Sequence, residues 1–196
     1  DGRYSFNIPA KSSPAHDEWR LANSAALCGD KCHSDELDAY KDSIHGKEAL
    51  GKHNKKAAVC ADCHSSHDIG NTSASAVKLA ITASCGGCHA ENYKSYKATY
   101  HGQISTLGYA NTAKCFDCHG SHDILAAKDP ASKVHADNRM ETCKTCHNGK
   151  KDIAEAPKGF ATFQPHGTTD NFARYPQMWI GYQIMVQLLV GTFGFF

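Results

Sequence analysis

Ten cysteines in this 196-residue chain form five pairs, and a histidine directly follows the second cysteine of each pair. Four pairs have the spacing C-x-x-C-H, which is the attachment signature of haem c. The two thiols add to the two vinyl groups of the porphyrin, and the histidine supplies one axial nitrogen to the iron. The sequence therefore predicts five haem c groups as cofactors. The predicted attachment sites are Cys28, Cys32, Cys60, Cys63, Cys85, Cys88, Cys115, Cys118, Cys143 and Cys146, and the predicted proximal iron ligands are His33, His64, His89, His119 and His147.

Two other uses of paired cysteines fit this pattern less well. Disulfides do not require a histidine after every second cysteine, and structural zinc takes four ligands, which divides five Cys-Cys-His triplets unevenly. The first motif departs from the signature because three residues separate Cys28 from Cys32. We expect the extra residue to bulge at Gly29, which tolerates unusual backbone angles, so that both thiols still reach a haem.

An internal repeat runs through the haem motifs. Residues 32–69 align with residues 88–124, with an offset of 56 positions in the first part and 55 in the second. A third unit opens at Cys143 and contains a single motif. The repeat therefore predicts two and a half copies of a two-haem module. The units span residues 28–69, 85–124 and, as a half repeat, 143–166.

Apolar residues recur at helical spacing after the first motif of each module. They are Leu37, Tyr40 and Ile44 in one module and Tyr93, Tyr96 and Tyr100 in the next. The spacing predicts one helix in each module, with Ser34 as an N-cap and with Gly46 and Gly102 just beyond the C-terminal ends. No strand pattern of any length is present. We therefore expect a mainly α fold with much irregular loop, a multihaem cytochrome c whose core is filled by haems.

Eight histidines lie outside the motifs, and five of them are needed as second, distal ligands of the irons. His45 follows His33 by twelve residues, about 18 Å along a helix, so it should bind a neighbouring haem rather than the same iron. His67 follows His64 by only three residues, too short a path around a porphyrin edge, and His122 has the same spacing. The predicted distal ligands are His45, His67, His101, His122 and His166, and the further candidates are His135, His53 and His16.

The overall composition bears on both partners and core. The chain has 21 Lys and Arg against 20 Asp and Glu, without a basic run, so nucleic acid is not expected as a partner. Aromatic residues make up only 9% of the chain, which leaves a thin apolar core for this length. We expect the porphyrins to fill that space.

The C-terminal segment is strongly apolar and carries no charge after Arg174. About 20 apolar residues span a bilayer core, Pro176 suits a first helical turn, and Trp179 suits a membrane interface. Gln183 and Gln187 are less typical of a membrane span. We expect a membrane helix here, as in a longer membrane protein that has been cut. The alternative is an apolar tail docked on another subunit.

These features divide the chain into an N-terminal arm (1–27), a pentahaem cytochrome c domain (28–170) and a hydrophobic membrane-anchor segment (171–196). Covalent haem attachment takes place outside the cytoplasm, so we expect an exported protein, with Asp1 as a processed start. The expected location is the periplasmic or extracellular side of a membrane, where the C-terminal segment anchors the protein.

Residues 43–46 read Ser-Ile-His-Gly and residues 99–102 read Thr-Tyr-His-Gly, each between a haem motif and a following C-x-x-C-H-x-x-H. In this combination, residues 28–166 resemble multihaem c-type cytochromes, in particular membrane-anchored quinol-oxidising cytochromes and the repeat cytochromes of outer-membrane electron conduits. The resemblance implies bis-histidine haems of low potential and electron transfer without substrate chemistry. The widened first motif departs from that pattern, as does a C-terminal anchor, since the quinol-oxidising relatives carry theirs at the N-terminus.

We therefore expect electron transfer through five haems, from a membrane quinol or cytochrome b subunit to a periplasmic or extracellular acceptor, with redox proteins as partners. An electron carrier is favoured over an enzyme, and such a carrier can be a subunit of an oxidoreductase complex. One alternative is a multihaem reductase of a small nitrogen or sulfur oxyanion, which needs an iron with an open position. The other is a cytochrome that polymerises into a conducting filament, in which His16 would donate a ligand to a neighbouring copy.

Overall fold

A computed structural model describes residues 12–147 and 166–195, and in these residues the chain is helical and contains no strand. The predicted mainly α class is confirmed for this part of the chain. The beginning of the predicted N-terminal arm and most of the half repeat lie outside the described residues. In chain order the helices are α1 (Pro14–Cys28), α2 (Ser34–Asp42), α3 (Ile44–Gly46), the π-helical turn η1 (Lys47–Gly51), α4 (Cys60–His64), α5 (Ser75–Cys88), α6 (Ala90–Ala98), α7 (Tyr100–Thr106), α8 (Cys115–His119), α9 (Arg139–Lys144) and α12 (Pro176–Phe193).

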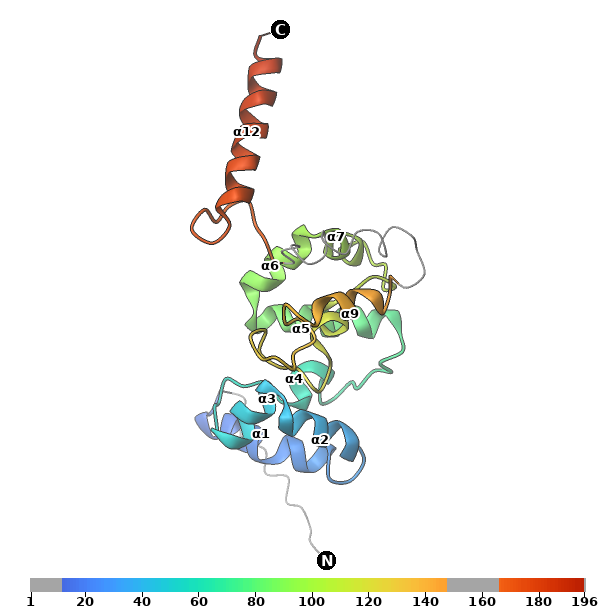
Figure 1. Ribbon diagram of the computed structural model, residues 1–196. Coiled ribbons are helices and arrows are strands. Elements are labelled where there is room, and N and C mark those ends of the chain that lie inside the picture. The colour runs from blue at the N-terminus through green and yellow to red at the C-terminus, as the bar shows by residue number, and fades with distance from the viewer. Residues whose placement is uncertain (1–11, 148–165, 196) are drawn as a thin grey trace, which may run out of the picture.

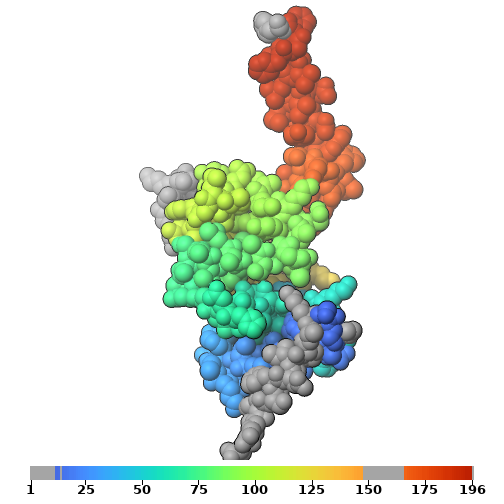
Figure 2. Space-filling model, turned by 180° about the vertical axis from the view of Figure 1, so that it is seen from behind, coloured from blue at the N-terminus to red at the C-terminus, as the bar shows by residue number. Residues whose placement is uncertain are grey.

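The two modules follow one another along an elongated molecule (Figure 1). α1, α2 and α3 lie together at the end nearest the N-terminus, and α4 leads from there to the layer that contains α5. α6 and α7 lie beyond α5, and α12 projects from the opposite end. Figure 2, from behind, shows the same order and shows α12 standing clear of the helical body. The order of the modules in space is therefore their order in the sequence.

The predicted C-terminal membrane helix is wrong. α12 is a helix, but none of the described helices is both long and apolar enough to cross a membrane. Its 18 residues rise about 27 Å, less than the ~30 Å of a bilayer core. Three glutamines and two glycines lie within it and lower its hydropathy: Gln177, Gln183, Gln187, Gly181 and Gly191. Absence of charge alone did not make the segment apolar enough.

In each module, the single predicted helix is in fact two helices. The break falls at Ser43 or Thr99, two residues before His45 or His101. Ser43 lies in extended backbone between α2 and α3, and its hydroxyl accepts a hydrogen bond from Gly46 N at 2.9 Å and donates one to Tyr40 O at 2.7 Å. Thr99 makes the same two bonds between α6 and α7. A hydroxyl that accepts from the third residue of a helix is an N-cap. The chain therefore starts a new helix just before each histidine of the Ser/Thr-x-His-Gly sequences.

The glycines of these sequences are not helix C-caps, so this prediction is wrong. Gly46 ends α3 with helical backbone angles, and Gly102 lies inside α7. A Cβ atom on either glycine would fall on the carbonyl oxygen of Tyr40 or Tyr96 at the end of the preceding helix. Glycine is therefore required because the new helix approaches the old one closely. The predicted N-cap is also displaced by one residue, since Ser34 is the first residue of α2.

The side-chain core of the described residues is small. One buried cluster lies between α1, η1 and the segment before α4, with Tyr40 packed against it; its members are Leu21, Ala49, Ala57 and Val59. The apolar stripe predicted for the repeat is only partly buried, since Tyr96 is 9% exposed and Tyr100 is 77% exposed. The break at Thr99 explains this difference, because it places Tyr100 on a different helix. The buried apolar cluster is therefore confined to the N-terminal part of the described residues.

Two tyrosines tie the first half of each module to the second half. The Tyr40 hydroxyl donates to Ala58 O at 2.8 Å, and the Tyr96 hydroxyl donates to Ala113 O at 2.9 Å. Burial, with help from the neighbouring Cys60 and Asp62, raises the pKa of Tyr40 to about 12, so this hydroxyl keeps its proton. The acceptor carbonyl comes two residues before the second haem motif in both modules. In each module, this bond fixes the position of the second motif relative to the helix that follows the first motif, which is α2 or α6.

Candidate functional site

The second motif of each module forms a single helical turn that is closed by an aspartate. α4 and α8 begin at the first cysteine of their motifs and end at its histidine. Asp62 accepts a hydrogen bond from Val59 N at 2.7 Å, and Asp117 accepts one from Lys114 N at 2.8 Å. An acidic side chain that accepts from a free N–H at a helix start stabilises that turn. The aspartate therefore fixes the conformation from which both thiols and the histidine project.

Each of these aspartates is paired with a cation. The two cations come from different positions in their modules. Arg20 of α1 pairs with Asp62 and also donates to Lys55 O at 2.8 Å. Lys114 Nζ lies 2.8 Å from Asp117 Oδ2 and donates to two backbone carbonyls, and its side chain is only 5% exposed. Both cations compensate a carboxylate next to a haem motif, where an unpaired charge would be costly to bury.

Within each module, the first cysteines of the two motifs are neighbours. The Cys115 thiol donates a hydrogen bond to Cys85, which lowers the pKa of Cys85 to about 7 and raises that of Cys115. In the first module, burial followed by the neighbouring Cys28 thiol raises the pKa of Cys60. The widened first motif therefore also has its first cysteine near the first cysteine of the second motif.

Thiols of successive modules are neighbours as well. Burial, followed by the Cys85 thiol of the next module, raises the pKa of Cys63 to about 11. Burial, followed by Asp117 and then by the Cys143 thiol of the third unit, raises the pKa of Cys118 to about 11. None of the ten cysteines forms a disulfide. The five motifs therefore form a row in which each is adjacent to the next along the chain.

Eight histidine rings form four pairs, and every pair joins one motif histidine with one histidine from outside the motifs. The distance between the two ring centres varies only from 6.0 to 6.2 Å over the four pairs. The pairs are His45–His89 at 6.2 Å, His64–His122 at 6.0 Å, His101–His147 at 6.1 Å and His119–His166 at 6.1 Å. The structure thus brings four of the predicted proximal ligands together with four of the predicted distal ones.

This separation fits one metal atom between two imidazoles. With a metal–nitrogen bond of about 2 Å and about 1 Å from nitrogen to ring centre, two imidazoles on opposite sides of a metal have centres about 6 Å apart. Among the described residues, no three His, Cys, Asp or Glu side chains converge as a metal site made by protein alone would require. Two nitrogen ligands, with two thiols beside them, fit an iron whose remaining four ligands come from a porphyrin.

The environment of five of the eight paired rings favours the neutral imidazole. Burial is the main cause that lowers the pKa of His45, His64, His101 and His119, and the partner ring of each pair lowers it further. Burial also lowers the pKa of His166. A neutral imidazole carries the free lone pair that a metal ligand needs, so the protonation state agrees with the fit of the distances.

Ser95 sets the tautomer of one distal candidate. Its hydroxyl donates to Asn92 O at 2.8 Å and lies 2.9 Å from His166 Nδ1. A hydroxyl has a single proton, so Ser95 accepts from His166 Nδ1–H and leaves Nε2 unprotonated. Ser95 is 3% exposed and sits in α6, which makes it a rigid support. Such a bond to the far nitrogen fixes the orientation of a ligating imidazole and increases its basicity.

The four pairs follow a simple register along the repeat. His45 and His101, which follow the Ser or Thr cap by two residues, pair with the first-motif histidine of the next unit. In the other direction, His122 pairs with His64, the second-motif histidine of the preceding unit. His166 plays the part of His122 for the third unit, since it pairs with His119. Every pair therefore crosses a boundary between units, as cross-ligation of neighbouring haems requires.

The other predicted iron ligands are not brought into such pairs. His33 has 65% of its side chain exposed and lies 3.8 Å from Glu36. His67 and His53 are exposed. His135 Nδ1 lies 3.4 Å from Asp137 Oδ2, and His16 Nδ1 lies 3.9 Å from Asp17 Oδ1. Among the described residues, His33 is the one motif histidine without a ring partner.

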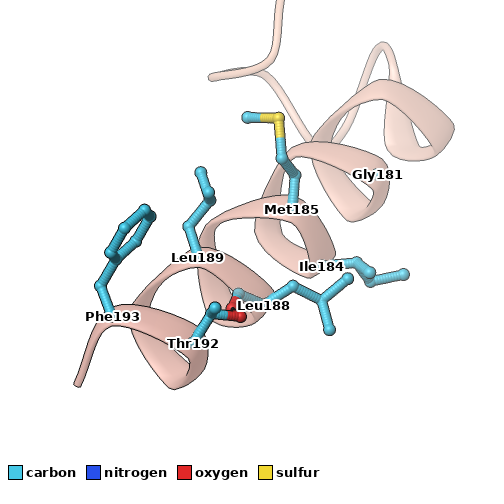
Figure 3. Close-up of a pocket in the computed structure, with 7 residues that line it drawn as sticks. All are labelled: Gly181, Ile184, Met185, Leu188, Leu189, Thr192 and Phe193. Atoms are coloured by element: carbon cyan, nitrogen blue, oxygen red, sulfur yellow. Dashed lines mark hydrogen bonds between the residues drawn. The ribbon is translucent and has the colours of Figure 1, made fainter. Parts of the chain in front are cut away.

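α12 carries a separate surface feature. A shallow apolar groove runs along this one helix, and Figure 3 shows the side chains that line it. They are Gly181, Ile184, Met185, Leu188, Leu189, Thr192 and Phe193. None of the cysteines or histidines of the chain lies in the groove, so it is not part of the haem-motif row.

Comparisons with other proteins add no relative. No protein-family model, curated protein or solved structure matches the chain. The function of this chain is therefore inferred from its motifs and its geometry alone.

Several residues that support the site were missed in the sequence. The two aspartates inside the second motifs, Asp62 and Asp117, could have been found because both motifs read C-x-D-C-H. The tyrosine hydroxyls and Ser95 could not, because their partners are a backbone carbonyl and a distant histidine. Asp123, which directly follows His122, pairs with Lys133 at 2.8 Å.

Proposed function

We propose that this chain is an electron-transfer protein that binds five haem c groups covalently and holds at least four of their irons between two histidines. The observation that carries the proposal is the set of four imidazole pairs at 6.0 to 6.2 Å, each beside the thiols of a C-x-x-C-H motif. When bound, each haem would supply an iron that takes up and releases one electron.

The protein's own contribution is to hold the sites close together and in fixed orientation. Motifs that are adjacent in the chain have neighbouring thiols, and every histidine pair ties two units to one another. The unit boundaries are therefore made of the iron ligands themselves, which supports a continuous row of sites. Paired histidines leave no position on those four irons for a substrate, which favours a carrier over an enzyme.

The partners in this proposal are redox proteins. An exported location follows from the covalent attachment of haem, and the donor would be a membrane quinol or a cytochrome b subunit, with a periplasmic or extracellular acceptor. Neither partner requires this chain to cross the membrane.

Haem content provides the first test. The full chain, produced in a host that attaches haem c outside the cytoplasm, should carry five covalent haems by intact mass and by the pyridine haemochrome assay. Replacing both cysteines of one second motif (Cys115→Ala with Cys118→Ala) should remove one haem. Thr145→Ala, a change inside the spacer of the last motif, is the matched control and should retain all five. A chain that carries no covalent haem would refute the proposal.

Bis-histidine ligation has its own test. In the oxidised protein, the irons of the four paired sites should be low-spin by electron paramagnetic resonance. His101→Ala should convert one low-spin iron to a high-spin or ligand-accessible state, because His147 would lose the ring that lies 6.1 Å away. An unchanged spectrum in this variant would show that His101 is not a ligand.

A further inference from the structure

Ser95 and Ala39 hold equivalent positions in the two modules, 56 residues apart, and of the two only Ser95 has a hydroxyl. The next residue of each helix shows that the positions correspond in space. Tyr40 and Tyr96 each donate to a carbonyl oxygen two residues before the second motif of their module, at 2.8 and 2.9 Å. α2 and α6 are therefore placed alike relative to those motifs, and residues 39 and 95 differ in chemistry and not in location.

The histidines that complete the two second-motif sites correspond as well. His122 and His166 each face the histidine of a second motif, with ring centres 6.0 and 6.1 Å apart. The turn after His122 is tied to the first module, because Ile44 N donates to Ile124 O at 2.7 Å. His166 is tied to the second module by Ser95 of α6 at 2.9 Å. Each distal histidine therefore lies against the module whose second motif it completes.

The polar support of His166 comes from one turn of α6. The Ser95 hydroxyl lies 2.9 Å from His166 Nδ1 and donates to Asn92 O at 2.8 Å. Burial lowers the pKa of His166, and a hydrogen bond from its ring to the carbonyl of Asn92 acts in the opposite direction. A carbonyl can only accept, so the ring nitrogen on this side carries the proton. The ring therefore donates to acceptors of α6 and keeps Nε2 free for the iron.

A hydrogen bond at Nδ1 changes how strongly the ring binds iron. An imidazole whose far N–H donates to an acceptor gains negative character and becomes a stronger donor to the metal. A stronger donor stabilises the ferric state more than the ferrous state, so it lowers the reduction potential of the haem. In the first module, the methyl group of Ala39 can accept no such proton. The two equivalent sites therefore differ in one contribution to their potentials.

We infer that Ser95 is a positioning residue that lowers the reduction potential of the haem between His119 and His166. The equivalent haem between His64 and His122 lacks this contribution, because its module has Ala39 at the same position. The inference rests on the proposed function, since it assumes haem at both second motifs. Ser95 thereby biases an electron that the two sites share toward the haem of the first module.

Reciprocal exchange of the two residues tests this inference on the full chain, after five haems have been verified by intact mass. Nuclear magnetic resonance of the haem methyl groups at a series of poised potentials gives the midpoint potential of each haem. Ser95→Ala should raise one of these potentials, and Ala39→Ser should lower a different one. The expected size is about tenfold in the ratio of reduced to oxidised haem at a fixed potential, or about 59 mV for a one-electron couple.

Two further variants identify the haem and control for packing. The haem that responds to Ser95→Ala should be the one whose low-spin signals are lost in His166→Ala. Ser95→Thr keeps a hydroxyl at the same backbone position and should leave all the potentials unchanged. A shift in Ser95→Thr equal to that in Ser95→Ala would overturn the inference, because the hydroxyl would then not be the cause.

Several other results would overturn the inference. They are unchanged potentials in both exchange variants, a lower potential in Ser95→Ala, and equal shifts at several haems, which would mean that Ser95 supports the packing of α6. If Ser95→Ala binds fewer than five haems, Ala39→Ser decides alone, because it adds a hydroxyl at a half-buried position and leaves the His166 site intact. A failure confined to these potentials leaves the proposed electron transfer standing, whereas a wild-type chain without covalent haem refutes the proposed function itself.

Discussion

The first and second modules reach the same arrangement with different residues around their second motifs. In the second module, Lys114 directly precedes the motif and pairs with Asp117 at 2.8 Å. In the first module, the equivalent position is Val59, and the cation is Arg20, which reaches Asp62 from a helix 42 residues away. A cation beside the motif aspartate is therefore preserved between the modules, although its origin in the sequence is not.

The modules also differ in how their first motifs are completed. His89 of the second module faces His45 of the first at 6.2 Å, whereas His33 is exposed and has no such ring. In the described residues, the first-motif histidines His89 and His147 each take their ring partner from the unit before. The pairing of rings therefore joins one unit to the next and does not complete a unit from within.

The largest expected effect on stability comes from removing the cation beside each motif aspartate. Lys114→Met removes a buried charge and leaves Asp117 and two carbonyls without their partner, so we expect a loss of about 3 kcal/mol in the free energy of unfolding. Arg20→Met should cost about 1–2 kcal/mol, since Asp62 has 42% of its side chain exposed and water can replace the arginine. Urea unfolding of the haem-loaded protein, followed by far-ultraviolet circular dichroism, measures both.

A rescue variant sharpens this prediction. Val59→Lys in the Arg20→Met background gives the first module the cation of the second and should recover part of the lost stability. Equal losses in the two single variants would contradict the expected difference between a buried and a half-exposed ion pair. No recovery in the double variant would contradict the view that the two cations have equivalent roles.

The next effect concerns the glycines that both modules share. Gly46→Ala and Gly102→Ala would each place a Cβ atom on the carbonyl oxygen of the preceding helix, and we expect about 2 kcal/mol of destabilisation for each. Gly51→Ala is the control, because a Cβ atom there meets no atom within 4 Å, and it should change stability by less than about 1 kcal/mol. Loss of a low-spin iron signal in Gly46→Ala would link the close approach to the orientation of His45. A tolerated alanine at both repeat glycines would refute it.

The sequence predicted the haem motifs, the repeat and the helical class because each has a strong local signal. It also predicted that His45 and His101 serve neighbouring units, from the length of helix that separates them from their own motifs. It could not predict the pairing itself, since His67 and His122 have nearly the same local sequence, but of the two only His122 has a ring partner among the described residues. That distinction exists only in the three-dimensional register of the repeat.

The errors share a physical cause. A glycine after a helical pattern predicts a C-cap, but at Gly46 it serves a close contact between helices, which no local pattern reveals. The apolar stripe predicts that Ser43 lies inside one helix, although Ser43 is a cap that starts a new helix. In the C-terminal segment, absence of charge predicts a membrane helix, but glutamines and glycines lower the mean hydropathy. In each case, one local property of a residue predicts its role in the helix. The role actually depends on a tertiary contact or on the hydropathy of the whole helix.

A smaller effect is expected from the tyrosines that tie each module together. Tyr40→Phe and Tyr96→Phe each remove one hydrogen bond to a carbonyl, and we expect about 1 kcal/mol of destabilisation for each. The two changes lie in different modules and should add within about 0.5 kcal/mol in the double variant. Thermal unfolding of the three variants measures this. Strong non-additivity would mean that the modules are coupled beyond their shared histidine pairs.

The smallest expected effect comes from the hydrogen bond between Ser95 and His166, which has no counterpart in the first module. Ser95 accepts from His166 Nδ1–H, whereas the equivalent position of the first module, 56 residues earlier, is Ala39, which has no hydroxyl. Ser95→Ala makes the second module like the first, and we expect it to cost about 0.5–1 kcal/mol, because His166 is partly exposed and water can replace the serine.

A spectroscopic readout separates orientation from mere stability in this last case. Because Ser95 holds the imidazole that faces His119, Ser95→Ala should alter the low-spin resonance of one iron and leave the other signals unchanged. Ser95→Thr keeps a hydroxyl on the same backbone position and should restore the original resonance. A change that spreads over several irons would mean that Ser95 supports the packing of α6, and an unaltered spectrum would mean that the tautomer of His166 is fixed without it. Either result would mean that Ser95 and its counterpart Ala39 do not make the two modules different in how the paired histidine is oriented.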